Sequence, residues 1–238
     1  MTCPEPGRRA TVRLKGLSSQ DELAAAARSS LYRRLAEAFA FPTPGLVEAV
    51  ASRRFLVELL SEGSNLPFDL VLDAGAQAAL ADTSVSHEEL QQEYIRLFEV
   101  GPGRPPCPLY EGSHRSGRFK LMEELVRFYE HFGLQPQPGD QPDHLCAELE
   151  FMHYLAFKEA AALSTGGPSA AFVLAQRDFL QRHLCRWLPR LHRRLEGLQP
   201  PPFYRVLAWL TDEFSARDLA ALKRRGAKPD SELVPLPD

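Results

Sequence analysis

Helical periodicity interrupted by clusters of proline and glycine is the feature that most limits the fold of this chain. Within the segment 18–42, Leu31, Leu35 and Phe39 recur every four residues, which places them on one face of a helix. A proline inside a helix costs about 3 kcal/mol, so most of the 20 prolines must lie in connections. They gather with glycines at 101–108, 135–142, 166–168 and 199–202, which we take as the loops between helices.

The segments between these loops predict an all-α fold, a single helical bundle domain of about eight to ten helices. Helical patterns extend over about 18–42, 44–62, 69–81, 86–99, 116–133, 143–163, 169–196 and 203–224, with a bend expected at Pro189. Strict apolar–polar alternation is limited to 11–15, too short for a sheet. We expect the bundle to occupy 18–225, between a flexible arm at 1–17 and a flexible tail at 226–238.

Composition and charge exclude several classes of function. The chain is 44% hydrophobic and 25% charged with a net charge of −3, and so lacks the basic excess of nucleic-acid-binding proteins. No apolar run reaches the roughly 18 residues of a membrane span, and the residues after Arg8-Arg9 are too polar for an export signal. The four cysteines form no CxxC pair, which predicts reduced thiols in a cytoplasmic protein.

Two Glu-x-x-His motifs bring a metal site into question, because di-iron bundles carry such motifs on facing helices. The motif at 111–114 falls in a loop. The motif at 150–153 lies on a helix, but its side chains point in the wrong direction to share a metal ion with His144. At about 100° per residue, His153 lies opposite His144 on the helix, so these side chains cannot converge on one ion. A His144–Glu148 pair at i, i+4 remains, and a helical-bundle metal-dependent enzyme using these two residues is the alternative function.

Other catalytic signatures are missing from the sequence. It contains no GxSxG nucleophile elbow and no glycine-rich phosphate loop, and Cys107 has no assigned base. We therefore predict no catalytic residue, no metal and no cofactor.

The segment 181–197 is basic, with Arg182, Arg186 and Arg190 at steps of four residues. One interpretation is a solvated helix face whose long side chains cover apolar surface. The other is a docking surface for an acidic partner, which would make the protein a helical adaptor.

The stretch 93–114, EYIRLFEVGPGRPPCPLYEGSH, is the most unusual in the chain. Tyr94, Leu97 and Phe98 end a helix as an apolar cluster, and a proline-stiffened loop then carries Tyr110 and Glu111. Prolines that restrict a loop in advance lower the entropic cost of binding. Composition alone leaves two interpretations open, a partner-binding loop and a loop fixed to its own core by Tyr110.

This stretch, followed by PDHLCAELEFMHYL at 142–155, resembles the TorD/DmsD/NarJ family of molybdoenzyme maturation chaperones. LYRRLAEAFAFP near the N-terminus and FYRVLAWLTDEF near the C-terminus are also similar to family helices, so the resemblance covers roughly 25–220. The form LFEVGPGRPPCPLYEG is most similar to chaperones of type II dimethyl-sulfoxide-reductase-like enzymes, whose clients include dimethyl sulfide, ethylbenzene, selenate and chlorate enzymes.

The resemblance implies a cytoplasmic, TorD-like all-α protein without catalysis or cofactor. Such a chaperone binds the twin-arginine signal peptide or the apo form of a molybdopterin-dependent oxidoreductase catalytic subunit. It delays export while the cofactor is inserted. The resemblance also implies a monomer or homodimer, without nucleic acid or stable membrane association, and 135–142 is a candidate hinge.

The family's binding residues carry over to matching positions in this chain. They are Tyr32, Tyr94, Leu97, Phe98, Pro106, Pro108, Tyr110, Glu111, Pro142, Asp143, His144 and Glu148. Buried arginine must be paired with an acid, so we expect Asp143 and Glu111, with Glu99 as a third candidate, to receive the two arginines of the signal. Tyr94, Leu97, Phe98 and Tyr110 are then expected to line an apolar groove. Some family members carry tryptophans near the first cluster, where Tyr94 and Tyr110 stand here.

Overall fold

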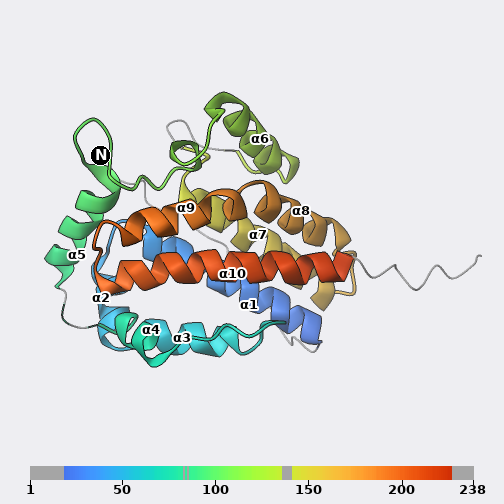
Figure 1. Ribbon diagram of the computed structural model, residues 1–238. Coiled ribbons are helices and arrows are strands. Elements are labelled where there is room, and N and C mark those ends of the chain that lie inside the picture. Colours follow the sequence, from blue (N-terminus) through green and yellow to red (C-terminus); the bar gives the residue numbers. More distant parts are fainter. Residues whose placement is uncertain (1–18, 83, 85, 136–140, 227–238) are drawn as a thin grey trace, which may run out of the picture.

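The computed structural model describes residues 19–82, 84, 86–135 and 141–226, and it confirms the all-α prediction. Within these residues lie ten α-helices (Figure 1): α1 (Gln20–Phe39), α2 (Pro44–Ala51), α3 (Arg54–Gly63), α4 (Ala74–Ala79), α5 (His87–Tyr94), α6 (Arg118–His131), α7 (Leu145–Ser164), α8 (Ala170–Arg182), α9 (Leu184–Glu196) and α10 (Pro202–Gly226). A π-helical turn, η1 (Ile95–Glu99), extends α5, and a 3-10 turn, η2 (Glu111–Ser113), precedes α6. The predicted arm at 1–17, the tail after 226 and the centre of the expected hinge, 136–140, lie outside the described residues.

Side chains that satisfy free backbone N–H groups start several of these helices. Ser19 accepts a hydrogen bond from the backbone of Glu22, whose carboxylate accepts one from the backbone of Ser19. Ser86 and Glu89 form the same capping box at the start of α5. Pro44 suits the first turn of α2, where a missing N–H costs nothing.

Three predicted helical segments are wrong in their extent. The segment 44–62 divides at Arg53, which has a left-handed φ of 59°, and 69–81 is helical only in α4. The segment 169–196 breaks at His183, where φ is −119° and ψ is −97°, whereas Pro189 lies inside α9. The break turns the ring of His183 toward a buried partner, with its Nδ1 2.9 Å from Glu111. A long-range contact, rather than the local proline, therefore sets the division.

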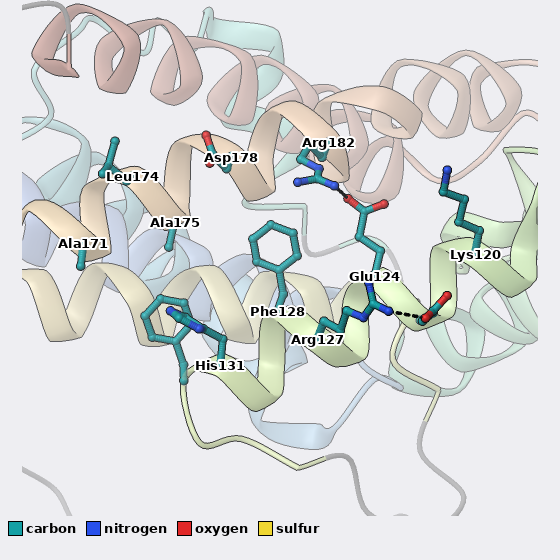
Figure 2. A pocket seen from close by; sticks show the side chains of 12 residues that line it. Lys120, Glu124, Arg127, Phe128, His131, Ala171, Leu174, Ala175, Asp178 and Arg182 are labelled. Atoms are coloured by element: carbon teal, nitrogen blue, oxygen red, sulfur yellow. Dashed lines mark hydrogen bonds and ion pairs between the residues drawn. The ribbon is translucent and has the colours of Figure 1, made fainter.

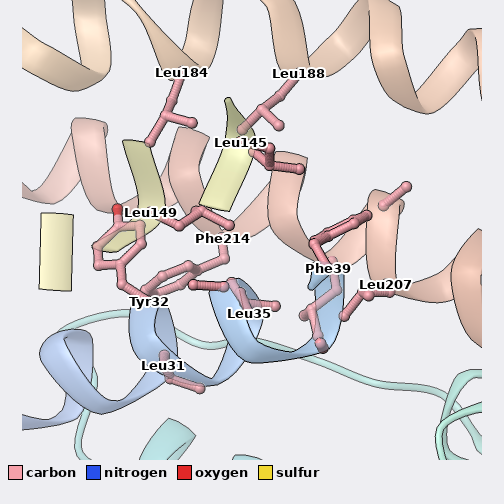
Figure 3. Packing of buried hydrophobic residues seen from close by; sticks show 14 of the residues in the cluster. Leu31, Tyr32, Leu35, Phe39, Leu145, Leu149, Leu184, Leu188, Leu207 and Phe214 are labelled. Atoms are coloured by element: carbon pink, nitrogen blue, oxygen red, sulfur yellow. The ribbon is translucent and has the colours of Figure 1, made fainter. Parts of the chain in front are cut away.

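The core lies between α1 and α7, the most extensive helix pair, and α9 and α10 complete it. The predicted stripe of Leu31, Leu35 and Phe39 is confirmed as buried. Figure 3 shows this stripe packed with leucines of α7 and α9 and with Phe214 of α10. One hydrophobic cluster therefore runs through α1, α7, α9 and α10.

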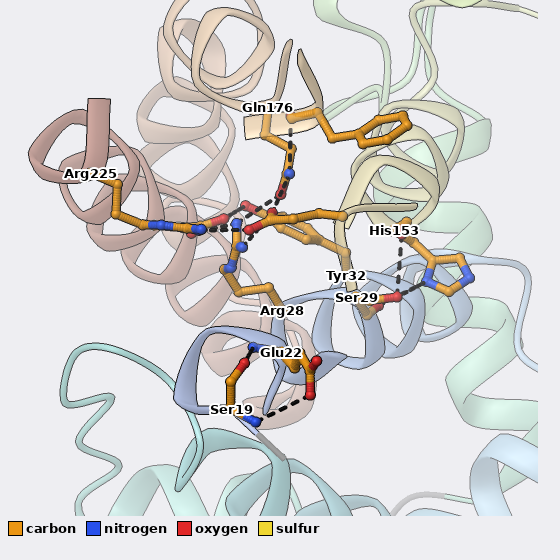
Figure 4. Close-up of polar contacts among 11 residues, drawn as sticks. Ser19, Glu22, Arg28, Ser29, Tyr32, His153, Gln176 and Arg225 are labelled. Carbon is orange, nitrogen blue, oxygen red and sulfur yellow. Dashed lines mark hydrogen bonds and ion pairs between the residues drawn. The ribbon is translucent and has the colours of Figure 1, made fainter. Parts of the chain in front are cut away.

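A buried charged network also crosses the core, and the sequence pattern did not predict it (Figure 4). Arg28 of α1 donates hydrogen bonds to Glu159 of α7 at 2.6 Å and to Gln176 of α8 at 2.7 Å. Asp218 of α10 lies 3.6 Å from Arg28 and accepts a hydrogen bond from the Tyr32 hydroxyl at 2.8 Å. Tyr32, which we expected near the binding groove, is a buried member of this network, and its part in partner binding stays a prediction.

Helix α6 stands apart from the other helices in Figure 1. Gly117, with φ 82°, precedes it, and Gly133, with φ 73°, follows it. Glycine adopts this left-handed conformation without the penalty that other residues incur. Aromatic side chains attach α6 to the bundle: the rings of Phe128 and Tyr129 lie 6.4 and 4.8 Å from the ring of Phe151 in α7. The position of α6 is therefore set by its aromatic contacts with α7, while a glycine turn at each end connects it to the rest of the chain.

Candidate partner-binding site

The proline-rich loop and the start of α7 lie side by side. Tyr110 and His144 form an isolated antiparallel bridge. The N–H of Glu111 donates to the carbonyl of Asp143 at 2.8 Å, and the N–H of Leu145 donates to the carbonyl of Leu109 at 2.8 Å. The two motifs identified in the sequence are therefore one structural unit.

His144 forms the N-cap of α7. Its Nδ1 accepts a hydrogen bond from the N–H of Cys146 at 3.2 Å, and its ring meets the ring of Tyr110 edge-on at 5.0 Å. Burial lowers the pKa of His144 to about 4, so the ring is neutral at neutral pH, as an acceptor nitrogen requires. The carbonyl of Pro142 accepts a hydrogen bond from the Tyr129 hydroxyl at 2.7 Å, which fixes the helix start to α6.

Three carboxylates, Glu111, Asp143 and Glu148, lie beneath this unit with 0% exposure, and we call them the acidic centre. Asp143 Oδ2 accepts a hydrogen bond from the N–H of Gly112 at 3.1 Å, and Glu148 Oε2 accepts one from the indole N–H of Trp187 at 3.2 Å. Among the described residues, Asp143 Oδ1 has no hydrogen-bond partner, whereas the side chain of Glu148 also shares a hydrogen bond with that of Glu111. A buried acceptor without a donor costs about 1–3 kcal/mol. The acidic centre therefore has unused capacity for hydrogen-bond donors.

Glu148 favours its protonated form. Burial is the largest cause that raises its pKa well above the ordinary value, and the charge of Glu111 acts in the same direction. The hydrogen bond from Trp187 lowers the pKa, and the charge of Asp143 raises it further. Burial and the neighbouring carboxylates therefore shift Glu148 toward its protonated form.

Cationic and polar groups close one side of the acidic centre. Glu111 forms an ion pair with Arg115, and His183 Nδ1 donates to it at 2.9 Å. His183 Nε2 lies 3.6 Å from Glu124 of α6. Arg115 also donates to the carbonyl of Arg182, at the C-terminus of α8, at 2.9 Å. Glu111 is thus held by two donors, one of which belongs to the half-buried Arg115.

Sequence reasoning missed Arg115, His183 and Trp187. The opposite charges of Glu111 and Arg115 at i, i+4 were the one available signal, and such pairs are common on helices. His183 and Trp187 reach the acidic centre only through the position of α9 against the loop, which no local pattern specifies.

The apolar groove expected along Tyr94, Leu97 and Phe98 is not open in this structure. All three are buried, and Tyr110 is half-buried. The turn η1 continues the helix through these residues, and Phe98 packs edge-on against Tyr204 of α10 at 5.3 Å. The expectation of an exposed groove is therefore corrected, because these side chains form core beneath the loop. Their participation in partner binding stays a prediction.

The proline-rich loop is fixed against this core. Pro106 is half-buried, and Pro108 is buried with its carbonyl accepting a hydrogen bond from His114 Nε2 at 2.7 Å. The N–H of Cys107 donates to the carbonyl of Leu97 at 2.8 Å. The loop is therefore a rigid mount for Glu111.

An open cleft of about 610 Å³ lies between α6 and α8 (Figure 2). Its apolar lining consists of Phe128, Phe132, Ala171, Leu174 and Ala175. Its charged and polar lining consists of Lys120, Glu123, Glu124, Arg127, His131, Asp178 and Arg182. Figure 2 shows the ring of Phe128 directed between the two helices and the ion pair of Glu124 with Arg182. The cleft is an accessible apolar surface bordered by charges of both signs.

The geometry gives little support to the two alternative sites. Within the described part of the chain, no group of three or more His, Cys, Asp and Glu side chains could hold a metal ion. The side chains of His144 and Glu148 bond to different partners and not to each other. Arg182, Arg186 and Arg190 are exposed as predicted, but they belong to two helices, and Arg190 donates to a loop carbonyl. None of the helices described here combines the length and apolarity needed to cross a membrane.

Comparison with known proteins gives a consistent assignment. Residues 67–193 match the protein family described as "Nitrate reductase delta subunit". The "Selenate reductase assembly chaperone protein" of Thauera selenatis is 45% identical over 134 residues, which are 52% of this chain and 69% of that protein. The "Perchlorate reductase assembly chaperone protein" of Dechloromonas aromatica is 32% identical over 198 residues, 79% of this chain and 86% of that protein. The "Chaperone protein TorD" of Vibrio parahaemolyticus is 28% identical over 180 residues, 73% of this chain and 82% of that protein.

Proposed function

Because this chain belongs to the nitrate reductase delta subunit family, within the TorD/DmsD/NarJ group, we propose that it is a cytoplasmic, non-catalytic assembly chaperone. Its client is the catalytic subunit of a molybdopterin-dependent oxidoreductase. The chaperone binds the twin-arginine signal peptide of this subunit, its apo form, or both, and delays export until the cofactor is inserted. The names of the relatives from Thauera and Dechloromonas favour an oxyanion reductase as the client.

The observation that carries this proposal is the bridge between the proline-rich loop and α7. It holds Glu111 and Asp143 together in the acidic centre. A guanidinium that leaves water must be paired with an acid and hydrogen-bonded. Asp143 Oδ1 is a buried acceptor with no partner among the described residues, so it suits this role.

The remaining candidate residues support this site in the proposal. Pro106, Pro108 and Tyr110 fix the loop that carries Glu111, and Pro142 and His144 fix the start of α7. Glu148 and the buried Tyr32, Tyr94, Leu97 and Phe98 form the interior on which both parts rest. Most of these residues thus position the two acids and contact the peptide little.

Titration calorimetry with a synthetic peptide tests the site. The peptide carries two arginines followed by an apolar stretch, and the full-length protein is used. We expect Asp143→Ala and His144→Ala to keep the fold, judged by circular dichroism, and to weaken binding by about tenfold, which corresponds to about 1.4 kcal/mol. Glu93→Ala, which removes a surface ion pair with Arg96, is the matched control. Wild-type affinity in both site variants would show that the site lies elsewhere.

Elemental analysis of the purified protein separates this function from the metal-enzyme alternative. Stoichiometric iron, zinc or manganese would support the enzyme. Partner binding that survives substitutions in the proline-rich loop but is lost at high salt would instead support an adaptor that binds through 181–197.

A further inference from the structure

The cleft between α6 and α8 ends beside the acidic centre. Glu124 lines the cleft and lies 3.6 Å from His183 Nε2, while His183 Nδ1 lies 2.9 Å from Glu111. Arg182 also lines the cleft, and its carbonyl accepts a hydrogen bond from Arg115, the ion-pair partner of Glu111. An apolar surface and a buried carboxylate are therefore connected through two short contacts.

This end of the cleft is built to hold a guanidinium. Arg115, which is not itself part of the lining, places one beside this end of the cleft, between the carboxylate of Glu111 and the carbonyl of Arg182. The carbonyl groups at the C-terminus of α8 favour a cation. A planar guanidinium can donate to both acceptors at once, which an ammonium group does less well. The side chain of Arg115 is 25% exposed, so it can leave this place without disruption of the core.

We propose that the α6–α8 cleft takes the apolar stretch of the client's signal peptide, and that an arginine of the signal replaces Arg115 on Glu111. This inference rests on the proposed function and adds the position of the apolar segment and the exchange of guanidinium groups. The chain's own Arg115 keeps Glu111 paired until the client arrives. The exchange moves no net charge into or out of the acidic centre.

The dimensions and lining of the cleft agree with such an occupant. Its lining on α6 extends from Lys120 to His131, with Phe132 directly after the helix, and its lining on α8 extends from Ala171 to Arg182. Twelve helical residues extend over about 18 Å, so the cleft accommodates a short apolar helix laid along it. Leu174 is 45% exposed there, and its contact with such a helix would cover it.

The order of features in the cleft matches the order of features in the partner. A twin-arginine signal presents its arginines first and its apolar stretch next. The position between Glu111 and the Arg182 carbonyl, which Arg115 now occupies, lies near the end of the cleft at Arg182. The apolar lining at Leu174 and Ala171 lies further along α8, toward its N-terminus. The signal therefore would run along α8 from its C-terminus toward its N-terminus.

Fluorescence anisotropy with a labelled peptide of two arginines and a twelve-residue apolar stretch tests this inference in the full-length protein. We expect Leu174→Asp to weaken binding about tenfold, because it places a charge against the apolar stretch. Val57→Asp on α3, at a residue 61% exposed, is the matched control and keeps wild-type affinity. We expect Arg115→Ala to tighten binding about threefold or more, because the peptide no longer competes with an internal guanidinium. Arg217→Ala, which removes an exposed i, i+4 pair with Glu213 on α10 outside the cleft, is its control.

The outcomes separate the two proposals. If wild type binds the peptide and Leu174→Asp binds it as tightly as Val57→Asp does, the apolar stretch does not bind in the cleft. Unchanged or weaker binding by a folded Arg115→Ala variant would overturn the exchange. Wild-type protein that binds neither this peptide nor one with a longer apolar stretch would overturn the proposed signal-binding function, and the inference with it.

Discussion

Replacement of Glu148 by glutamine should make the protein more stable than wild type at neutral pH but not at pH 5. The pKa of the Glu148 carboxyl is raised in the folded chain, first by burial and then by the charge of Glu111, from its ordinary value of 4.5. Above that value the unfolded chain releases a proton that the folded chain still holds. The free energy of unfolding therefore falls as pH rises from about 4.5 toward the folded-state pKa.

The size of the effect follows from proton linkage. One proton held only in the folded state lowers the free energy of unfolding by about 1.4 kcal/mol per pH unit. Between pH 5 and pH 7 the wild type should lose up to about 3 kcal/mol by this route. Glutamine is neutral at every pH, and its carbonyl can still accept the hydrogen bond from Trp187, which now reaches Glu148 Oε2 at 3.2 Å. The variant should lack this loss.

Urea denaturation followed by circular dichroism at pH 5, 6 and 7, at constant ionic strength, measures the difference. The stability of Glu148→Gln relative to wild type should increase steadily with pH. Glu130→Gln, at an exposed residue of α6, reports the effect of the same chemical change at the surface. A Glu148→Gln difference that stays constant from pH 5 to pH 7 would refute the reasoning, because it would mean that Glu148 has the same protonation in the folded and unfolded chains.

Three further predictions concern stability and are checked by urea denaturation. Arg28→Ala should lower the free energy of unfolding by about 3–5 kcal/mol, because it leaves buried carboxylates without their partner. Arg217→Ala on the surface should lower it by only about 0–1 kcal/mol, and equal losses in the two variants would contradict this. Gly101→Ala should cost about 1–3 kcal/mol, because the added Cβ would lie 2.4 Å from the carbonyl oxygen of Arg104. Ser19→Ala should cost about 0.5–2 kcal/mol through loss of the capping box, and a neutral result would show that this helix end contributes no stability.

Local pattern was sufficient for most of the fold. Apolar spacing and capping residues placed α1 and α10 to within a few residues, because these signals act over one or two turns. The errors lie where a distant contact overrides the local pattern. The long segment 169–196 divides at His183, whose ring bonds to Glu111, 72 residues earlier in the chain. Nothing near His183 in the sequence specifies that partner.

The same limit applies to the candidate site. Helix geometry correctly separated His144 from His153, and Glu148 lies with Leu145 and Leu149 on the buried side of α7. Helix geometry could not show that Glu111 and Trp187 would meet Glu148 there, since both come from other parts of the chain. The motifs brought Glu111 and Asp143 to attention, but their burial and the presence of Arg115 depend on how the loop packs.

Because Glu111 already forms an ion pair with Arg115, a twin-arginine partner gains little binding free energy from Glu111. A buried carboxylate left without a cation would cost several kcal/mol, so Arg115 stabilises the unliganded protein. A client arginine that replaces it exchanges one ion pair for another, and this exchange adds little net free energy. Affinity must then come mainly from apolar surface covered in the α6–α8 cleft, at about 25 cal/mol per Å². Selectivity comes from the place between Glu111 and the Arg182 carbonyl, which suits a planar guanidinium with several donors. A peptide with two lysines should therefore bind more weakly than one with two arginines, even though both carry the same charge and the same apolar stretch.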